Sequence, residues 1–257
     1  MHRLRFVHRA GIAAAAAAVL IPGAAWAGKR VTAGDHQSLQ LSVSVQPSKA
    51  GARVTKLHIH SDYRNTSGNG QQPPVNSSAT IFKLPKGTTF HFSAAHACKE
   101  SAVIKAPTTA APCPASTKLG SGSVVVNARP TVAALVHGQV TEFNGVDDSN
   151  AGGYGQGSPV LFLYVKTTIG LDLTDFFHVV KTGGGLELIG KNTKPSHSGF
   201  VPGNFTLQTL DLTSTSSPSA YFKNPPKCAG SWRFALTLTN FFGQPSITAP
   251  DNVRCRA

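Results

Sequence analysis

The sequence contains little charge and, after its first 27 residues, no long apolar segment. Only 14% of its 257 residues are charged, and 11 acids stand against 24 Lys and Arg. Heptad repeats and long amphipathic helices are also missing. Because a membrane-spanning helix needs roughly 20 apolar residues, we expect no transmembrane segment after residue 27, and no coiled coil.

The motifs of several enzyme classes are absent as well. There is no Gly-x-Ser-x-Gly, and Gly183-Gly184-Gly185 lacks the Lys-Ser/Thr of a phosphate-binding loop. A glycosidase needs two carboxylates that face one groove. Six acids could supply such a pair, but no motif supports any of them: Glu142, Asp147, Asp148, Asp172, Asp175 and Glu187. We therefore expect no enzyme. A secreted hydrolase or metal-dependent enzyme is the alternative.

Residues 1–27 have the three-part layout of a secretory signal peptide. Arg3, Arg5 and Arg9 precede an apolar run from Gly11 to Ile21, and the segment ends in Ala25-Trp26-Ala27. The run is too short for a membrane anchor. We predict cleavage after Ala27 and a secreted, extracellular product that comprises residues 28–257.

That product is basic. Three of the 24 cations lie in the predicted signal, which leaves 21 against 11 acids, a net charge of about +10. The cations are scattered, with the densest runs at Lys29-Arg30 and Arg254-Cys255-Arg256. Since a nucleic-acid reader clusters its charge on one face or helix, we expect no nucleic-acid partner. Solubility alone is enough to account for the positive charge. If the protein has a partner, the sequence favours an anionic cell-wall polymer or a glycan.

Short strands separated by turn residues recur along residues 28–257. Leu39 to Val45 alternates apolar and polar residues, and Val160 to Val165 is apolar on both faces, which indicates a central strand. The pattern predicts an all-β fold: a single antiparallel β-sandwich, Greek-key or jelly-roll-like, with a barrel as the related possibility.

Further strands are expected at residues 54–60, 79–84, 88–92, 122–128, 135–143, 186–189 and 205–212. Residues 171–180 are ambiguous, because Asp172 or Thr174 could cap a short helix. Polar composition predicts loops at residues 61–78, 145–158 and 191–203, and a linker at 213–218. These loops would carry any ligand, with Tyr63, Tyr154 and Phe200 as exposed rings.

The four cysteines form two close pairs in sequence. Cys98 and Cys113 bracket a Pro/Ala/Thr loop, while Cys228 and Cys255 bracket a hairpin centred on Phe241-Phe242. Four cysteines allow three pairings. Short separation and the symmetry of the hairpin favour Cys98–Cys113 and Cys228–Cys255, which makes the cysteines structural rather than catalytic. In that hairpin, Trp232 should face the core and lie opposite roughly Asp251.

Several motifs together resemble a family of secreted β-rich proteins from high-GC Gram-positive bacteria. They comprise the Cys-Pro-x-x-Ser-x-aliphatic-Gly-x-Gly segment of residues 113–122, Lys83 to Gly87, Ala128 to Pro130, Val140 to Gly145, and the closing Cys228…Trp232…Cys255. The family has no established activity, so the resemblance implies secretion, the cysteine arrangement and a β-rich fold, but no functional residues. Residues 249–254 are more polar and basic than the family pattern.

Two places could hold a metal ion. His58 and His60 lie on one strand face about 7 Å apart, and Asp62, His91 or His96 would have to add a ligand. A solvated polar face is the simpler interpretation. Asp147 to Asn150 is rich in oxygen ligands but lacks the Asp-x-Asp-x-Asp-Gly pattern, so an ordinary loop is expected there. No cofactor is predicted. We expect a secreted, non-catalytic β-sandwich that binds a ligand or glycan through its loops.

Overall fold

The computed structural model describes residues 28–34, 36–67, 77–105, 113–127, 135–150, 152–170, 172–191, 206–240 and 245–257. The predicted signal peptide, residues 1–27, lies outside this part of the chain. No helix of the described residues is long and apolar enough to cross a membrane.

The described chain is almost entirely β-structure. Its strands are β1 (Val31–Ala33), β2 (Gln37–Gln46), β3 (Lys56–Asn65), β4 (Ser77–Lys83), β5 (Thr89–Phe92), β6 (Cys98–Lys99), β7 (Lys118–Asn127), β8 (Leu135–Val146), β9 (Pro159–Thr167), β10 (Asp172–Thr182), β11 (Gly185–Lys191), β12 (Thr206–Thr215), β13 (Ala220–Lys223), β14 (Ser231–Asn240) and β15 (Ile247–Arg254). Its helices are α1 (Glu100–Lys105) and the short 3₁₀ turns η1 (Ala94–His96) and η2 (Ala115–Thr117).

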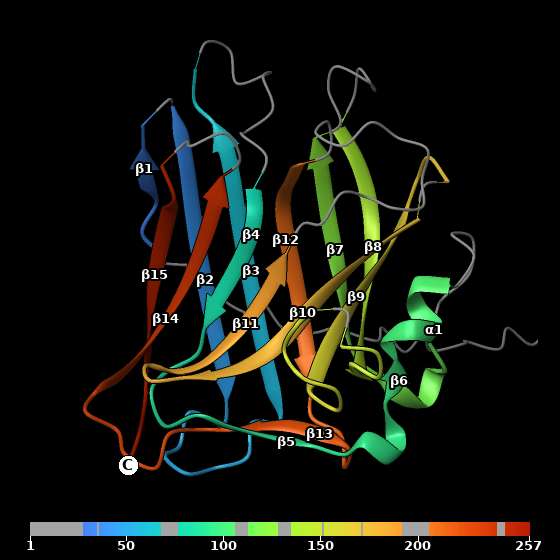
Figure 1. Ribbon diagram of the computed structural model, residues 1–257. Helices are drawn as coiled ribbons and strands as arrows, with labels where there is room; N and C mark the ends of the chain where they lie inside the picture. The colour runs from blue at the N-terminus through green and yellow to red at the C-terminus, as the bar shows by residue number, and fades with distance from the viewer. Residues whose placement is uncertain are drawn as a thin grey trace, which may run out of the picture.

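The strands build an antiparallel sandwich from one folded-over sheet. Its order is β1-β2-β3-β12-β7-β8-β9-β10-β11-β4-β14-β15. The sheet curls until its last strand reaches its second, so that β15 lies beside β2 (Figure 1). Near this closure the carboxylate of Asp251 accepts the Val43 N–H at 2.7 Å, and Arg256 N–H donates to the Ser48 carbonyl at 2.8 Å. The all-β sandwich predicted from the sequence is confirmed.

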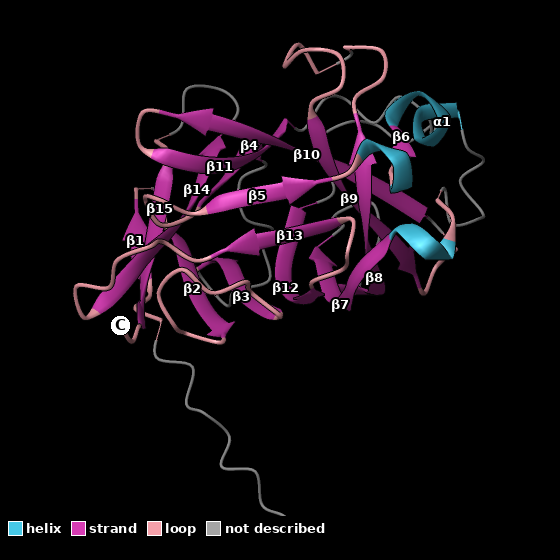
Figure 2. Cartoon of the chain, turned by 90° about the horizontal axis from the view of Figure 1, so that it is seen from below, coloured by secondary structure: helices cyan, strands magenta, loops and turns pink. Residues whose placement is uncertain are grey.

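The main core fills the space between the two layers. Alternation on β2 directs Leu39, Leu41, Val43 and Val45 inward, and β14 contributes Trp232, Phe234, Leu236 and Leu238 from the facing layer. A two-stranded sheet, β5 paired with β13, closes one end of the sandwich and adds Phe222 to this core (Figure 2). Residues 88–92 were expected to continue the main sheet, and this is wrong: β5 is a strand, but it pairs with β13 in the small sheet.

Strand β9 is covered on both faces, as its sequence predicts. Leu161, Leu163 and Val165 face the interior of the sandwich. Val160, Phe162 and Tyr164 face outward, where they pack with Val103 of α1 and the Cys98–Cys113 disulfide. A disulfide-closed segment thus covers the outer face of the sheet at β9, and it carries a six-residue helix where the sequence indicated only a loop.

Both predicted disulfides are present. Cys98 bonds Cys113 across 15 residues and Cys228 bonds Cys255 across 27. Trp232 faces the core as expected and is 4% exposed. Its partner on β15 is Val253 rather than Asp251, two residues from the expected register. The turn residues Phe241 and Phe242 lie outside the described residues.

Residues 172–182 form strand β10 rather than the short helix that Asp172 or Thr174 could have capped. The segment pairs with β9 on one side and with β11 on the other. Its residues alternate, with Phe177 and Val179 against the interior and Phe176 and His178 on the outer face. The backbone pairing available on both sides outweighs a local capping preference.

Five predicted boundaries of the loops and the linker are also wrong. Residues 61–65 continue β3, residues 77 and 78 begin β4, and residues 213–215 belong to β12. Tyr63, expected to be exposed, is 3% exposed because it lies on the same face of β3 as Leu57 and Ile59. Residues 145 and 146 close β8, and Lys191 ends β11. The rest of the third loop, including Phe200, lies outside the described residues.

Candidate functional site

Three ionisable side chains meet beneath α1, on the outer face of the sheet. Glu100 begins α1, Asp147 directly follows β8, and His178 lies in β10. The parallel pairing of β6 with the end of β8, with Cys98 opposite Gly145, sets α1 above Asp147. His178 pairs with Val160 of β9 and so shares the outer face with Phe162 and Phe176.

The cluster is compact and buried. One ligand atom from each of the three residues lies within 4.8 Å of the other two, and His178 Nε2 is 3.9 Å from Glu100 Oε1. The exposed fractions of Glu100, Asp147 and His178 are 4%, 0% and 4%. Glu100 Oε2, Asp147 Oδ2 and His178 Nδ1 are buried without a hydrogen-bond partner among the described residues. Buried polar atoms are paired in the great majority of native proteins, so three such atoms in one place form an unusual group.

Burial also changes the acidity of the cluster. It raises the pKa of Glu100 to about 7, and the nearby negative charge of Asp147 adds to the rise. Burial lowers the pKa of His178, with Lys191 acting in the same direction and Asp147 opposing it. Glu100 and His178 are thus held where their ionised forms lack solvation.

The neighbouring contacts hold the cluster in place. The carboxylate of Asp148 accepts the Ser101 N–H at 2.9 Å and the Ser101 hydroxyl at 2.6 Å, which ties the start of α1 to the end of β8. The Tyr154 ring lies 4.5 Å from the His178 ring, and Lys191 Nζ lies 4.9 Å from the Tyr154 ring centre. A Cβ on Gly152 would come within 2.3 Å of His178 Nε2, so only glycine fits beside this imidazole.

The structure brings His58 and His60 together with a different acid from those considered in the sequence. Asp211 of β12 lies 2.8 Å from His58 Nε2 and 3.4 Å from His60 Nδ1. Asp62 instead binds Arg30 and Arg64. The strand of His91, β5, belongs to the small end sheet, and β3 pairs with β2 and β12. Among the described residues, the set of three metal-type side chains that converges is Glu100, Asp147 and His178.

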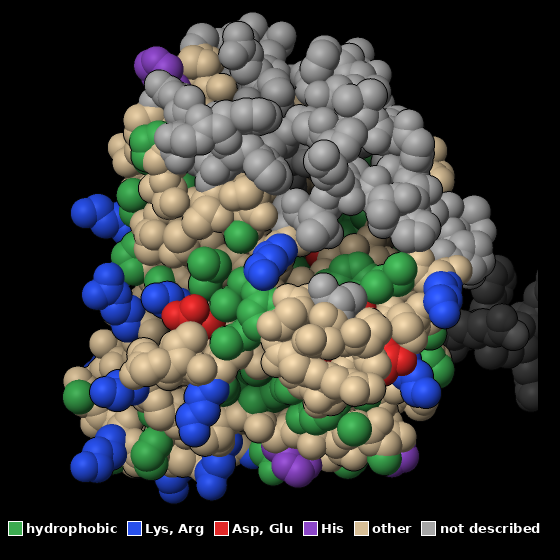
Figure 3. Space-filling view, viewed as in Figure 1, with side chains coloured by type: hydrophobic (Ala, Val, Ile, Leu, Met, Phe, Trp, Pro, Cys, Tyr) green, Lys and Arg blue, Asp and Glu red, His purple; other side chains and the backbone are tan. Residues whose placement is uncertain are grey.

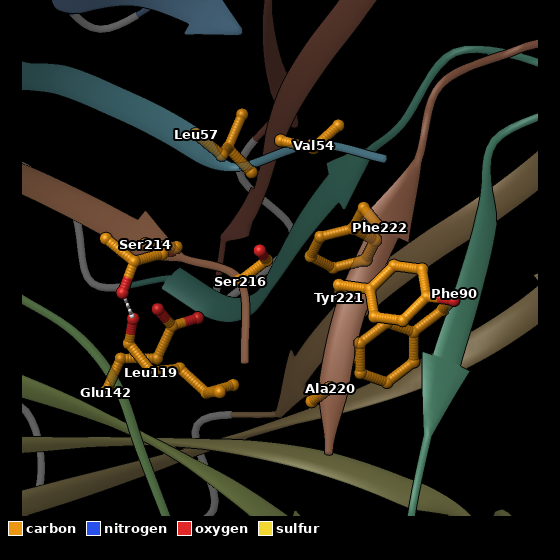
Figure 4. A pocket seen from close by; sticks show the side chains of 11 residues that line it. Val54, Leu57, Phe90, Leu119, Glu142, Ser214, Ser216, Ala220, Tyr221 and Phe222 are labelled. Atoms are coloured by element: carbon orange, nitrogen blue, oxygen red, sulfur yellow. Dashed lines mark hydrogen bonds between the residues drawn. The ribbon is translucent and has the colours of Figure 1, made fainter. Parts of the chain in front are cut away.

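Glu142 occupies a separate pocket between the main sheet and the small end sheet. Figure 4 shows its carboxylate hydrogen-bonded to Ser214 and facing a space lined by Leu57, Phe90 and Phe222. Glu142 is 3% exposed, and its Oε2 has no partner within the described residues. Burial raises the pKa of Glu142 to about 7, while the hydrogen bond from Ser214 opposes the rise.

Replacing Glu142 with glutamine is expected to stabilise the protein at pH 8. The pKa of Glu142 rises from 4.5 to about 7 on folding, so ionising Glu142 costs more free energy in the native state than in the unfolded chain. The resulting loss of stability is negligible below pH 4.5, grows as the pH rises to about 7 and is complete above it. Glu142→Gln should therefore raise the free energy of unfolding by about 3 kcal/mol at pH 8 and leave it nearly unchanged at pH 4.

Urea denaturation at the two pH values measures this difference. Glu187→Gln is the control, because Glu187 forms an ion pair with Lys83 at 3.1 Å and should not be stabilised by losing its charge. If Glu142→Gln raised the free energy of unfolding equally at pH 4 and pH 8, the effect could not be attributed to ionisation of Glu142.

Much of this site could not be found from the sequence. Asp147 was considered as part of an oxygen-rich loop and as one of six acids that could pair as in a glycosidase, and Glu100 and His178 were not singled out. The three positions are separated by 47 and 31 residues. One signal was present: His178 interrupts an apolar stretch of residues 176–180, where a solvated histidine is not expected.

The fold defines a class of protein: an all-β sandwich with two local disulfides and a buried acid–histidine cluster under a disulfide-closed segment. Comparisons of the chain with protein-family models, with curated proteins and with solved structures find no match.

Proposed function

We propose that the protein is a secreted, non-catalytic β-sandwich that binds an anionic polymer of the cell wall. The signal-like N-terminus, the two disulfides and the resemblance to secreted bacterial proteins support an extracellular location. The observation that carries the binding role is the distribution of charge over the folded chain.

Folding removes acids from the surface and leaves the cations on it. Five acids are buried: Asp62, Glu100, Glu142, Asp147 and Asp172. No Lys or Arg of the described residues is buried. The surface is therefore more basic than the net charge indicates, and such a surface attracts polyanions.

Part of this charge gathers over the C-terminal hairpin. Trp232 and Phe234 face the core, so the alternate residue Arg233 faces outward, together with Arg254 on β15 and Lys83 on β4. The exposed Lys86, Lys227 and Arg256 lie in the adjoining turns and at the end of β15. Figure 3 shows Lys and Arg side chains crowded in this region, at the lower left. We call Lys83, Lys86, Lys227, Arg233, Arg254 and Arg256 the basic face.

This face replaces the exposed aromatic rings as the basis for binding. Tyr63 is buried, and the Tyr154 ring packs at a tilt against His178 beneath Lys191. A partner recognised by spaced cations on a strand face is an extended polyanion, such as a phosphodiester polymer of the cell wall.

The test is sedimentation of the protein with purified cell walls, before and after chemical removal of their phosphodiester polymers. We expect binding that requires the polymers and falls as salt increases, since exposed charges are screened. Arg233→Glu/Arg254→Glu should weaken binding by about ten-fold or more. The control is Lys118→Glu/Lys166→Glu, which makes the same charge change at exposed sites on β7 and β9. If both double variants weakened wall binding equally, the basic face would be excluded as the binding surface. If walls without the polymers still bound the protein, the polymers would be excluded as its ligand.

A further inference from the structure

The buried cluster of Glu100, Asp147 and His178 has the components of a metal site. It supplies two carboxylates and one imidazole from three separate segments: α1, the end of β8, and β10. Each of the three residues carries one buried atom that has no hydrogen-bond partner in the part of the chain that the structure describes. In a buried position, such atoms are costly unless something occupies the space between them.

The ligand set selects among cations. Oxygen ligands alone suit Mg²⁺ or Ca²⁺, which take six or more oxygens. An imidazole among the ligands favours zinc and neighbouring transition metals. Zinc binds both imidazole nitrogen and carboxylate oxygen, and these three side chains leave its fourth tetrahedral position to a water molecule or to the second oxygen of a carboxylate. Ligand atoms within 4.8 Å of one another lie at most about 2.8 Å from a common centre, so each must move inward by up to roughly 0.6–0.8 Å to reach zinc at about 2.0–2.2 Å.

The surroundings resemble those of a structural rather than a catalytic ion. All three side chains are buried, and Tyr154 and Gly152 pack on the imidazole. The Cys98–Cys113 disulfide and the hydrogen bonds that Ser101 donates to Asp148 already fix the segment that carries Glu100. An ion here would join α1 to β8 and β10 and hold the covering segment on the sheet.

We propose that Glu100, Asp147 and His178 bind one zinc ion, which fastens the disulfide-closed segment to the outer face of the sheet. The site is distinct from the basic face and does not depend on polymer binding. It also differs from His58 and His60, whose neighbour Asp211 is half-exposed, with 46% of its side chain accessible.

Calorimetric titration of the chelator-treated, disulfide-intact protein with Zn²⁺ is the direct test. We expect one equivalent per chain and, with zinc at a hundred times its dissociation constant, a rise in melting temperature of roughly 5–10 °C. Ca²⁺ at the same concentration should give no comparable rise. The absence of zinc binding would overturn the proposal and leave a shared proton as the occupant of the cluster.

Two variants and one control locate the ion. Asp147→Asn and His178→Gln should each weaken zinc binding by a factor of ten or more, whereas His58→Gln/His60→Gln should retain the wild-type affinity. Unchanged binding in Asp147→Asn and His178→Gln would overturn the assignment. X-ray absorption of zinc bound to the wild-type protein gives a result that does not depend on how the variants fold. One imidazole with oxygen ligands is expected, and two imidazoles would place the ion at His58 and His60 instead.

Discussion

Replacing Phe162 with alanine is expected to lower the free energy of unfolding by about 3–5 kcal/mol. Phe162 is 0% exposed and packs edge-to-face on Phe176, with ring centres 5.3 Å apart. Its ring also lies directly over Gly145 of the neighbouring strand, where a Cβ would come within 2.0 Å of the ring. Because Gly145 lies against one side of the ring and has no side chain, nothing on that side can move into the space that alanine would leave.

Chemical denaturation of the wild-type and variant proteins measures this loss. Ile169→Ala is the matched control, since Ile169 is an exposed apolar residue just beyond the same strand, 47% accessible, and its loss should change stability by no more than about 0.5 kcal/mol. A loss below 1 kcal/mol in Phe162→Ala would show that the outer cluster of Val160, Phe162 and Tyr164 contributes little to stability.

Removing the C-terminal disulfide through Cys228→Ser/Cys255→Ser is expected to cost about 3.5 kcal/mol. The bond closes a loop across 27 residues and so restricts the unfolded chain. Near it, the Trp232 indole N–H donates to the Lys227 carbonyl at 3.1 Å, and Cys255 N–H donates to the Gly230 carbonyl at 3.1 Å. Since these bonds and the hairpin ladder do not need the sulfur atoms, the native circular dichroism should be unchanged while the denaturation midpoint falls.

The other disulfide provides the comparison. The Cys98–Cys113 disulfide closes a shorter loop across 15 residues, so its removal through Cys98→Ser/Cys113→Ser should lower the free energy of unfolding by about 3 kcal/mol. A C-terminal variant that keeps the wild-type midpoint would contradict a role for the bond in restricting the unfolded chain.

The two disulfides and most strands followed from local features of the sequence. Alternation in Leu39 to Val45 and in Trp232 to Leu238 has a period of two, which directs one face to the core whatever the partner strand is. The double-faced apolar run of β9 likewise required cover on both sides. Where pairing decided the outcome, sequence reasoning failed: β10 is a strand because β9 and β11 flank it, and β5 leaves the main sheet because it pairs with β13.

The candidate site shows the same limit. His58 and His60 could be placed on one face from their spacing, yet their acid neighbour Asp211 comes from β12, more than 150 residues away in the chain. Glu100, Asp147 and His178 carry no shared motif. Their meeting depends on β6 pairing with the end of β8 and on β10 lying next to β9.

The sequence by itself determined the chemical character of this protein: its basic charge, its period-two strands and its two close cysteine pairs. These are properties of composition and of neighbours along the chain, and they do not depend on which strands meet. Only the tertiary structure decided where the charges lie. Cations scattered along the chain gather on the face of β4, β14 and β15 because antiparallel register aligns their outward positions. The acids of the cluster are buried because a disulfide-closed segment folds over β9, and burial is a property of packing that no local pattern contains.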